Sequence, residues 1–202
     1  MAVDHAAAVE GGLKDPVFDG QAIFRALMNA FAEPGTITDL GSRVVAPASL
    51  VAAAAGILAA LADGDTPVWM EDPAGTDEAA AAWLRFQTGA PITSDPAAAC
   101  FVLMPECDDP ASWTRFPRGT PDYPDRSATL ILPIRFFSAG PRLVLTGPGI
   151  ETERTISPAG LHDGFIAAMR ANRACFPLGL DLILVCGRGA LALPRSTRIR
   201  EG

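Results

Sequence analysis

The chain has 202 residues, with 23 acidic and 16 basic side chains and a net charge of −7. This length predicts one domain that buries roughly 70% of the surface of its unfolded form and needs neither disulfides nor a metal to fold. The negative charge and the lack of a Lys/Arg-rich run argue against a nucleic-acid-binding patch. Charged residues make up only 19% of the chain, below the usual value of about 25%, so we expect other chains to cover some apolar surface.

The sequence carries no sign of export or of a membrane anchor. Residues 1–15 contain acidic residues and lack a hydrophobic core, which predicts a flexible N-terminal arm and not a signal peptide. The apolar stretch Ala46–Ala62 is mostly alanine and is shorter than a membrane span. No CxxC pair occurs among the cysteines, which predicts free, buried thiols in a reducing compartment, at Cys100, Cys107, Cys175 and Cys186. We therefore expect a cytoplasmic protein without a membrane partner.

In chain order, the first predicted helix runs from Asp19 to Ala32, with apolar residues at helical spacing and Asp19 as its N-cap. Glu33-Pro34-Gly35 ends it, because proline disfavours helical geometry in the preceding residue. We expect a short strand through Ile37 and Leu40. A second helix is predicted from near Pro47 to about Ala62, since proline is favoured in a first helical turn.

The middle of the chain alternates strands with helical patterns. A strand is predicted over Thr66–Met70, and Thr76 is the predicted cap of a third helix whose apolar face comprises Trp83, Leu84 and Phe86. Ile92 and the run Cys100–Met104 predict two more strands. Residues 105–127 are rich in proline and aspartate, so we expect a long loop there.

Two pairs of β-rich runs, each separated by a short turn, predict hairpins: Ala128–Phe137 with Arg142–Thr146, and Leu180–Cys186 with Ala190–Leu193. Between them, Ser157-Pro158 predicts the start of a fourth helix that reaches about Asn172. Early alternation followed by late hairpins predicts a single α/β domain over residues 16–202, with a mixed β-sheet flanked by helices.

The residue types argue against several self-sufficient catalytic centres. The only histidines are His5 and His162, without an HxxxH motif or a cysteine pair, so we expect no metal site. A helix-surface position is the favoured interpretation of His162, because no nucleophile motif accompanies it. Lys14 is the only lysine and lies outside the first predicted element, which argues against covalent pyridoxal phosphate chemistry.

One glycine-rich turn is a candidate anion contact. Thr146-Gly147-Pro148-Gly149 follows a predicted strand, where backbone N–H groups can bind a phosphate. It matches neither GxGxxG nor the P-loop, and a tight turn that requires glycine is the favoured explanation. Arg154 is near enough in the sequence to add a phosphate contact.

Other charged residues allow two interpretations each. Arg85 and Arg195 end predicted elements, where a guanidinium binds either an oxyanion or a carboxylate such as Asp181. Glu151 and Glu153 are either an acid–base pair or a solvated loop face, and we favour the loop face.

Several longer blocks are more specific than these single residues: Phe18–Met28, Glu33–Gly35, Asp63–Trp69, Leu84–Pro91, Ser127–Leu132, Leu145–Glu151, Phe176–Gly187 and Pro194–Thr197. In this order and spacing they resemble the PhnH family, the H subunits of the bacterial carbon–phosphorus lyase system. The similarity covers about residues 16–198, nearly the whole chain outside the arm.

The resemblance implies a role in the breakdown of organophosphonates. With the G, I and J subunits, the family is associated with displacement of adenine from ATP by a phosphonate, which gives alpha-D-ribose 1-methylphosphonate 5-triphosphate. It also implies a homodimer and a fold related to pyridoxal-phosphate-dependent transferases that does not use this cofactor.

We therefore expect a subunit of a ribosyl-phosphonate triphosphate synthase that is inactive alone. The alternative is a non-catalytic homodimeric module that binds a nucleotide or phosphonate. An independent enzyme is disfavoured by the shortage of histidine and lysine. No catalytic residue is predicted, and the candidate substrate or phosphate contacts are Arg85, Thr146, Gly147, Gly149, Arg154 and Arg195.

Overall fold

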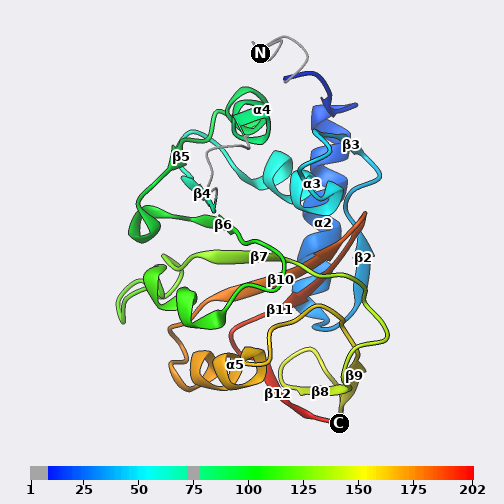
Figure 1. Cartoon of the computed structure of the whole chain (residues 1–202), viewed down its shortest axis with the longest axis vertical. Helices are drawn as coiled ribbons and strands as arrows, with labels where there is room; N and C mark the ends of the chain where they lie inside the picture. Colours follow the sequence, from blue (N-terminus) through cyan, green and yellow to red (C-terminus); the bar gives the residue numbers. More distant parts are fainter. Residues whose placement is uncertain (1–8, 72–77) are drawn as a thin grey trace.

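A seven-stranded sheet forms the centre of the molecule (Figure 1). The computed structural model describes residues 9–71 and 78–202. From edge to edge the strands are β2 (Ile37–Asp39), β11 (Gly189–Leu193), β10 (Asp181–Cys186), β7 (Thr129–Pro133), β6 (Phe101–Leu103), β4 (Val68–Met70) and β5 (Ile92–Thr93). β11 is antiparallel to both of its neighbours, whereas the strands from β10 to β5 are parallel. The predicted α/β domain with a mixed sheet is confirmed.

Three helices cover one face of this sheet: α2 (Pro16–Ala32), α3 (Ala52–Leu61) and α4 (Glu78–Thr88) (Figure 1). Ile23 and Leu27 of α2 pack with the alanine-rich α3 in the same buried cluster. Ile131 and Ile183 reach this cluster from the central strands β7 and β10. Small side chains on α3 bring that helix close to the sheet; a Cβ on Gly56 would lie 2.2 Å from the carbonyl oxygen of Leu40.

The opposite face carries a second layer, made of α5 (Phe165–Ala174), the 3-10 helix η2 (Pro110–Arg115) and a small antiparallel sheet. That sheet has the order β12 (Arg198–Glu201), β8 (Leu143–Thr146), β9 (Arg154–Ile156). Leu130 and Leu182 alternate with Ile131 and Ile183 along their strands and so face this second layer. Buried residues on both faces explain why β7 and β10 are continuous apolar runs.

The remaining elements are short. β1 (Gly12–Leu13) pairs with β3 (Val44–Val45), and the 3-10 helix η1 (Pro96–Ala98) precedes β6. Residues 9–15, which belong to the predicted arm, contact α4: Trp83 Nε1 donates to the Glu10 carbonyl at 3.2 Å and Gln87 Nε2 to the Val9 carbonyl at 2.9 Å.

α2 begins earlier than the sequence predicts. Asp15 is its N-cap, and its carboxylate accepts hydrogen bonds from the backbone N–H groups of Val17 and Phe18. Asp19 is instead a buried first-turn residue that accepts from the Asp15 backbone N–H and from Arg43. The assignment of Asp19 as N-cap is wrong, because Pro16 occupies the favoured first-turn position one residue after Asp15.

α3 begins later than predicted, at Ala52 and not near Pro47. The Leu50 N–H donates to the Pro47 carbonyl, so the proline opens a turn, and Val51 has extended geometry. The predicted cap of the third helix, Thr76, lies outside the described residues. Within α4, Trp83 and Leu84 are buried as predicted, but Phe86 is 68% exposed and does not belong to the core.

One predicted hairpin is wrong and the other is confirmed. β10 and β11 form the antiparallel pair that the sequence predicts. β7 and β8 belong to different sheets, since β7 pairs with β6 and β10 whereas β8 pairs with β9 and β12. After β7, Phe136 forms an isolated β-bridge with Ala159, and the chain then enters β8 in the small sheet.

The predicted fourth helix is also shorter than expected. Ser157-Pro158 does not open it; Ala159 pairs with Phe136 in an extended segment, and Gly160 has a φ of +92°. α5 begins at Phe165. The predicted loop 105–127 contains η2, whose Trp113 is buried with Phe116 in the core.

All four cysteines are free thiols, as predicted, but the prediction that they are buried is wrong. Cys107 is exposed and the other three are half-buried. Burial raises the pKa of Cys100 above its usual value, and the charge of Asp63 adds to this. No helix within the described ranges is both long and apolar enough to cross a bilayer.

Candidate functional site

The glycine-rich turn after β8 is a packing feature. Gly147 and Gly149 have φ values of +140° and +81°, and the Ile150 N–H donates to the Gly147 carbonyl at 3.1 Å. A Cβ on Gly149 would lie 1.9 Å from the carbonyl oxygen of Ala32, at the end of α2. Close approach of two backbone segments therefore requires this glycine, which favours the tight-turn interpretation over an anion site.

Arg154 is also committed to the fold. It lies on β9, and its Nη1 donates to the carbonyl oxygens of Glu33 and Pro34, both at 3.0 Å, and to the hydroxyl of Thr36. These bonds fasten the segment after α2 to the small sheet. All three hydrogen bonds come from Nη1, so this nitrogen is bound to acceptors within the protein.

Arg195 binds Asp181, the carboxylate named as the alternative partner. Its Nε lies 3.2 Å from both carboxylate oxygens, and its backbone N–H donates to Asp181 at 2.8 Å. The remaining nitrogens donate to the carbonyl of Pro124 at 2.6 Å and to the hydroxyl of Ser127. This side chain fixes the start of β10 to the end of β11, and the oxyanion-clamp interpretation has no support.

The predicted contacts only partly converge. Thr146 pairs with Arg198, and a Cβ on Gly147 would lie 3.2 Å from the carbonyl oxygen of Ser196, so the β8 turn lies beside the segment that follows Arg195. Arg85 is exposed on α4, which packs on the opposite face of the central sheet. Glu153 forms an ion pair with Arg200 at 2.7 Å on the surface, as expected for a solvated loop face.

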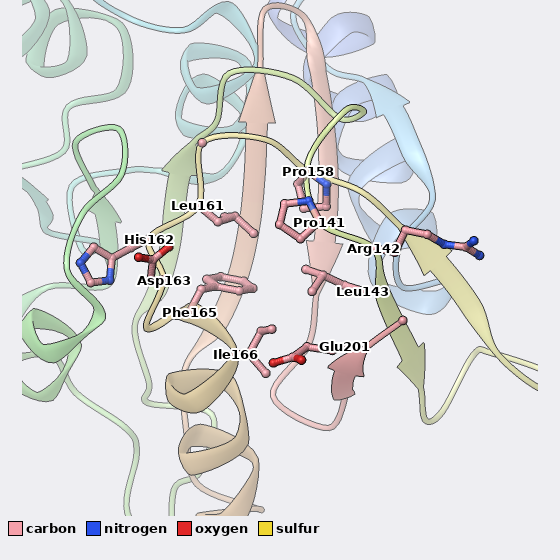
Figure 2. Close-up of a pocket in the computed structure, with 12 residues that line it drawn as sticks. Pro141, Arg142, Leu143, Pro158, Leu161, His162, Asp163, Phe165, Ile166 and Glu201 are labelled. Carbon is pink, nitrogen blue, oxygen red and sulfur yellow. The ribbon is translucent and has the colours of Figure 1, made fainter.

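A cavity of about 390 Å³ lies between the segment before α5, β8 and β12 (Figure 2). Figure 2 shows Leu143, Leu161, Phe165 and Ile166 gathered at its centre, while the guanidinium of Arg142 points away from them. Asp163 and Glu201 supply carboxylates to its lining. This combination of apolar side chains and negative charge disfavours a phosphate or a phosphonate.

His162 at the same cavity has a structural role. Its Nδ1 accepts a hydrogen bond from the Gly164 backbone N–H at 3.0 Å, and its carbonyl accepts from Phe165. The residue thus shapes the turn that opens α5, although it precedes the helix and does not lie on its surface as predicted. Among residues 9–71 and 78–202, no group of three His, Cys, Asp or Glu side chains is arranged to hold a metal ion.

A smaller cavity of about 260 Å³ lies at the carboxyl ends of β4 and β6, the edge where open α/β sheets commonly bind ligands. Glu71 and Glu106 line it. Each carboxylate is near an arginine: Arg115 lies 3.8 Å from Glu71, and Arg135 lies 2.7 Å from Glu106. These ion pairs leave little unbalanced charge for a charged ligand.

A further groove of about 280 Å³ separates η2 from α5. Trp113 and Arg118 both line it, and neither the indole Nε1 of Trp113 nor the Nε of Arg118 has a hydrogen-bond partner among the described residues. The sequence prediction missed this groove because residues 105–127 were expected to be a loop. The available signal was an aromatic and arginine-rich run, Trp113 to Arg118, within that expected loop.

Residues 11–200 match the family described as "Bacterial phosphonate metabolism protein (PhnH)". The chain belongs to the PhnH family. A relative from Rhizobium meliloti (strain 1021), named "Alpha-D-ribose 1-methylphosphonate 5-triphosphate synthase subunit PhnH", is 39% identical over 191 residues, covering 95% of each chain.

A second relative comes from Stutzerimonas stutzeri and is named "Putative C-P lyase subunit protein HtxG". It is 33% identical over 183 residues, which cover 89% of this chain and 85% of the relative. Both matches extend over nearly the whole domain, so the resemblance in the sequence blocks is confirmed.

Proposed function

We propose that this protein is the H subunit of a cytoplasmic complex that makes alpha-D-ribose 1-methylphosphonate 5-triphosphate for organophosphonate breakdown. One observation carries the proposal: a relative named as that subunit is 39% identical over 95% of both chains. In the reaction, a phosphonate oxygen forms a bond to C1′ of the ATP ribose while the bond from C1′ to adenine breaks, and adenine leaves with a proton.

The side chains of this subunit support a role that depends on partners. The transfer must position two polyanions and stabilise the departing base. Arg154 and Arg195 are held by protein acceptors, His162 is held by Gly164, and Lys14 is exposed. We therefore assign the reacting groups of the complex mainly to its other subunits.

Part of the surface suits contact with other chains. Val17, Phe24 and Met28 follow one another along α2 at spacings of seven and four residues, on its outer side. Val17 is 72%, Phe24 49% and Met28 52% exposed, and Phe18 beside them is 71% exposed. We propose that this α2 apolar face (Val17, Phe18, Phe24 and Met28) lies in a subunit contact, either in a homodimer or with the G, I or J subunit.

We also propose that the fold is related to that of pyridoxal-phosphate-dependent transferases and that this protein does not use the cofactor. A Schiff base requires a lysine whose amine is desolvated, and the only lysine, Lys14, is exposed between β1 and α2. Mixing the purified protein with pyridoxal phosphate tests this. We expect no lysine-dependent absorbance band, and a band that Lys14→Met removes would contradict the proposal.

Growth on methylphosphonate tests the pathway. Deletion of the gene should abolish growth when methylphosphonate is the sole phosphorus source and leave growth on phosphate unchanged. Complementation with the wild type should restore growth, whereas Phe24→Glu combined with Met28→Glu should not, because it places charges on the α2 apolar face. A matched variant, Phe86→Glu, changes an exposed phenylalanine on α4 and should complement fully. Normal growth of the deletion strain, without a redundant pathway, would refute the proposal.

A further inference from the structure

We propose that the groove between η2 and α5 is a binding site for a small phosphorus oxyanion, a phosphate or a phosphonate. Arg118 and Trp113 would supply its charge and its hydrogen-bond donors. In Figure 1, η2 is part of the green segment that lies next to α5. The inference does not depend on the proposed function, because the charge and the donors of the groove carry it.

No carboxylate of the described residues forms an ion pair with Arg118. Among these residues its Nη1 has only the Cys175 sulfur, at 3.9 Å. A thiol sulfur is a weak acceptor. Its Nε is buried and has no partner among the described residues. A half-buried guanidinium with this little compensation is a strong candidate for an anion contact, since desolvated donors are costly when left unpaired.

The backbone holds Arg118 in place. Its carbonyl accepts from the Gly179 N–H at 3.0 Å, and the residue forms a β-bridge with Ser127. The neighbouring Pro117 carbonyl accepts from the Ala128 N–H at 2.8 Å. A guanidinium on an anchored backbone loses less conformational freedom when it binds a ligand.

Trp113 supplies a second donor. The residue is 2% exposed, and its ring packs edge-on against Phe165 at a centroid distance of 5.9 Å. Its indole N–H has no acceptor among the described residues although the ring lines the groove. Buried tryptophan nitrogens are normally paired, so this donor calls for an acceptor that residues 9–71 and 78–202 do not provide.

Helix α5 forms one wall of the groove over most of its length, from Gly164 and Ala167 near its amino end to Asn172 near its carboxyl end. Arg118 lies at the carboxyl end of this wall, where its Nη1 is 3.9 Å from the sulfur of Cys175. The side chains of Ala167, Ala168 and Ala171 are small, which keeps the groove open.

Asp109 is the carboxylate of the groove that opposes an anion. It lines the groove, but its Oδ1 accepts from the Ala111 N–H at 3.0 Å and caps η2. Phosphorus oxyanions carry up to two negative charges and several acceptor oxygens. Their higher charge and larger number of acceptor oxygens should make them bind the guanidinium more tightly than a singly charged acetate does.

The test uses the indole N–H of Trp113 as its reporter. The ¹⁵N-labelled full-length protein is titrated at constant ionic strength with inorganic phosphate, methylphosphonate or acetate, and Trp113→Phe assigns the resonance. We expect the Trp113 indole resonance to shift saturably with phosphate or methylphosphonate, with half-saturation at millimolar ligand. The ligand that saturates at the lower concentration identifies the natural ligand class. Acetate should bind at least about tenfold more weakly. No saturable shift, or equal binding of acetate, would overturn the proposal.

Two pairs of variants separate binding from folding. Arg118→Gln should raise the half-saturation concentration by about tenfold or more, whereas Arg126→Gln, in the same segment but outside the groove, should leave it unchanged.

Ala167→Glu keeps a residue that a first helical turn favours and places a carboxylate at the groove, so it should abolish binding. Ala167→Gln has nearly the same size without the charge and should retain it. Binding that persists in both Arg118→Gln and Ala167→Glu would refute the site.

Discussion

Arg195 and Arg118 both pair with Ser127, but of the two only Arg195 forms an ion pair with a carboxylate of the described residues. The guanidinium of Arg195 binds Asp181, the Pro124 carbonyl and the Ser127 hydroxyl. Arg118 pairs with the backbone of the same Ser127, but within the described part of the chain its side chain has only a thiol within reach, and it borders a groove. Arg195 therefore stabilises the fold, whereas Arg118 keeps unpaired N–H donors that could bind a ligand.

The difference between Arg195 and Arg118 shows that the residue type alone does not determine whether an arginine stabilises the fold or binds a ligand. The sequence places Arg195 at the end of a predicted element, where either role is open, and Arg118 within a predicted loop. The acceptors that decide the role of Arg195 come from positions 14 and 71 residues away in the sequence. A guanidinium is therefore available to a ligand only when the folded chain leaves it without a carboxylate.

Substitution at Arg195 gives the largest expected effect. Arg195→Met leaves the partly buried Asp181 carboxylate without its partner and should lower the free energy of unfolding by about 4 kcal/mol, measured by urea denaturation. The double variant Arg195→Met with Asp181→Leu should recover part of this loss, because no unpaired charge remains. A loss below about 1 kcal/mol for Arg195→Met would mean that the ion pair with Asp181 contributes little to stability, and would contradict the structural role of Arg195.

Gly149→Ala should come next, with a loss of about 3 kcal/mol in the free energy of unfolding. Its Cβ would meet the Ala32 carbonyl at 1.9 Å in a backbone of positive φ. Gly64→Ala is the matched control, since nothing lies within 4 Å of the new Cβ, and it should change the free energy by less than about 0.5 kcal/mol. Equal losses of unfolding free energy for Gly149→Ala and Gly64→Ala would contradict the packing role of Gly149 and leave an anion-binding role for the turn open.

A smaller and pH-dependent effect is expected at Asp19. The Asp15 backbone N–H, followed by Arg43, holds the pKa of Asp19 below its ordinary value of 3.8. Its contribution to stability is therefore complete above pH 3.8 and is lost as the pH falls through the lowered value in the folded protein. Asp19→Asn should be less stable than the wild type at neutral pH, and urea unfolding across the acid range should show this difference vanish. A difference that stays constant with pH would contradict the charge-based explanation.

Arg118→Gln should have the smallest effect on stability, below about 0.5 kcal/mol, because no ion pair is lost. Thermal and urea unfolding of this variant beside Arg195→Met sharpen the comparison directly. A loss as large as that of Arg195→Met would mean that the Arg118 side chain is needed for folding.

The sequence predicts those parts of the fold that depend on local patterns. The apolar runs of β7 and β10, the β10–β11 hairpin and the end of α2 at Glu33 follow from periodicity and from proline. The predictions that failed depend on longer-range pairing. β7 and β8 are separated by a turn typical of a hairpin, but their partners lie elsewhere in the chain and place them in different layers.

The same limit applies to the site. Glycine and arginine at positions 147–154 leave an anion contact open beside the favoured tight turn, and the close approach of α2 supports the tight turn. In the opposite case, Trp113 and Arg118 belong to a proline-rich segment without a motif. Their unpaired donors become evident only when α5 packs against η2.

Release of adenine from ATP tests the central claim most directly. The purified chain is incubated with ATP and methylphosphonate, alone and with the G, I and J subunits, and free adenine is measured. We expect no adenine from the isolated chain, and adenine release by the mixture that falls when this chain is omitted. Turnover by the isolated chain, or full activity of the mixture without it, would contradict the account.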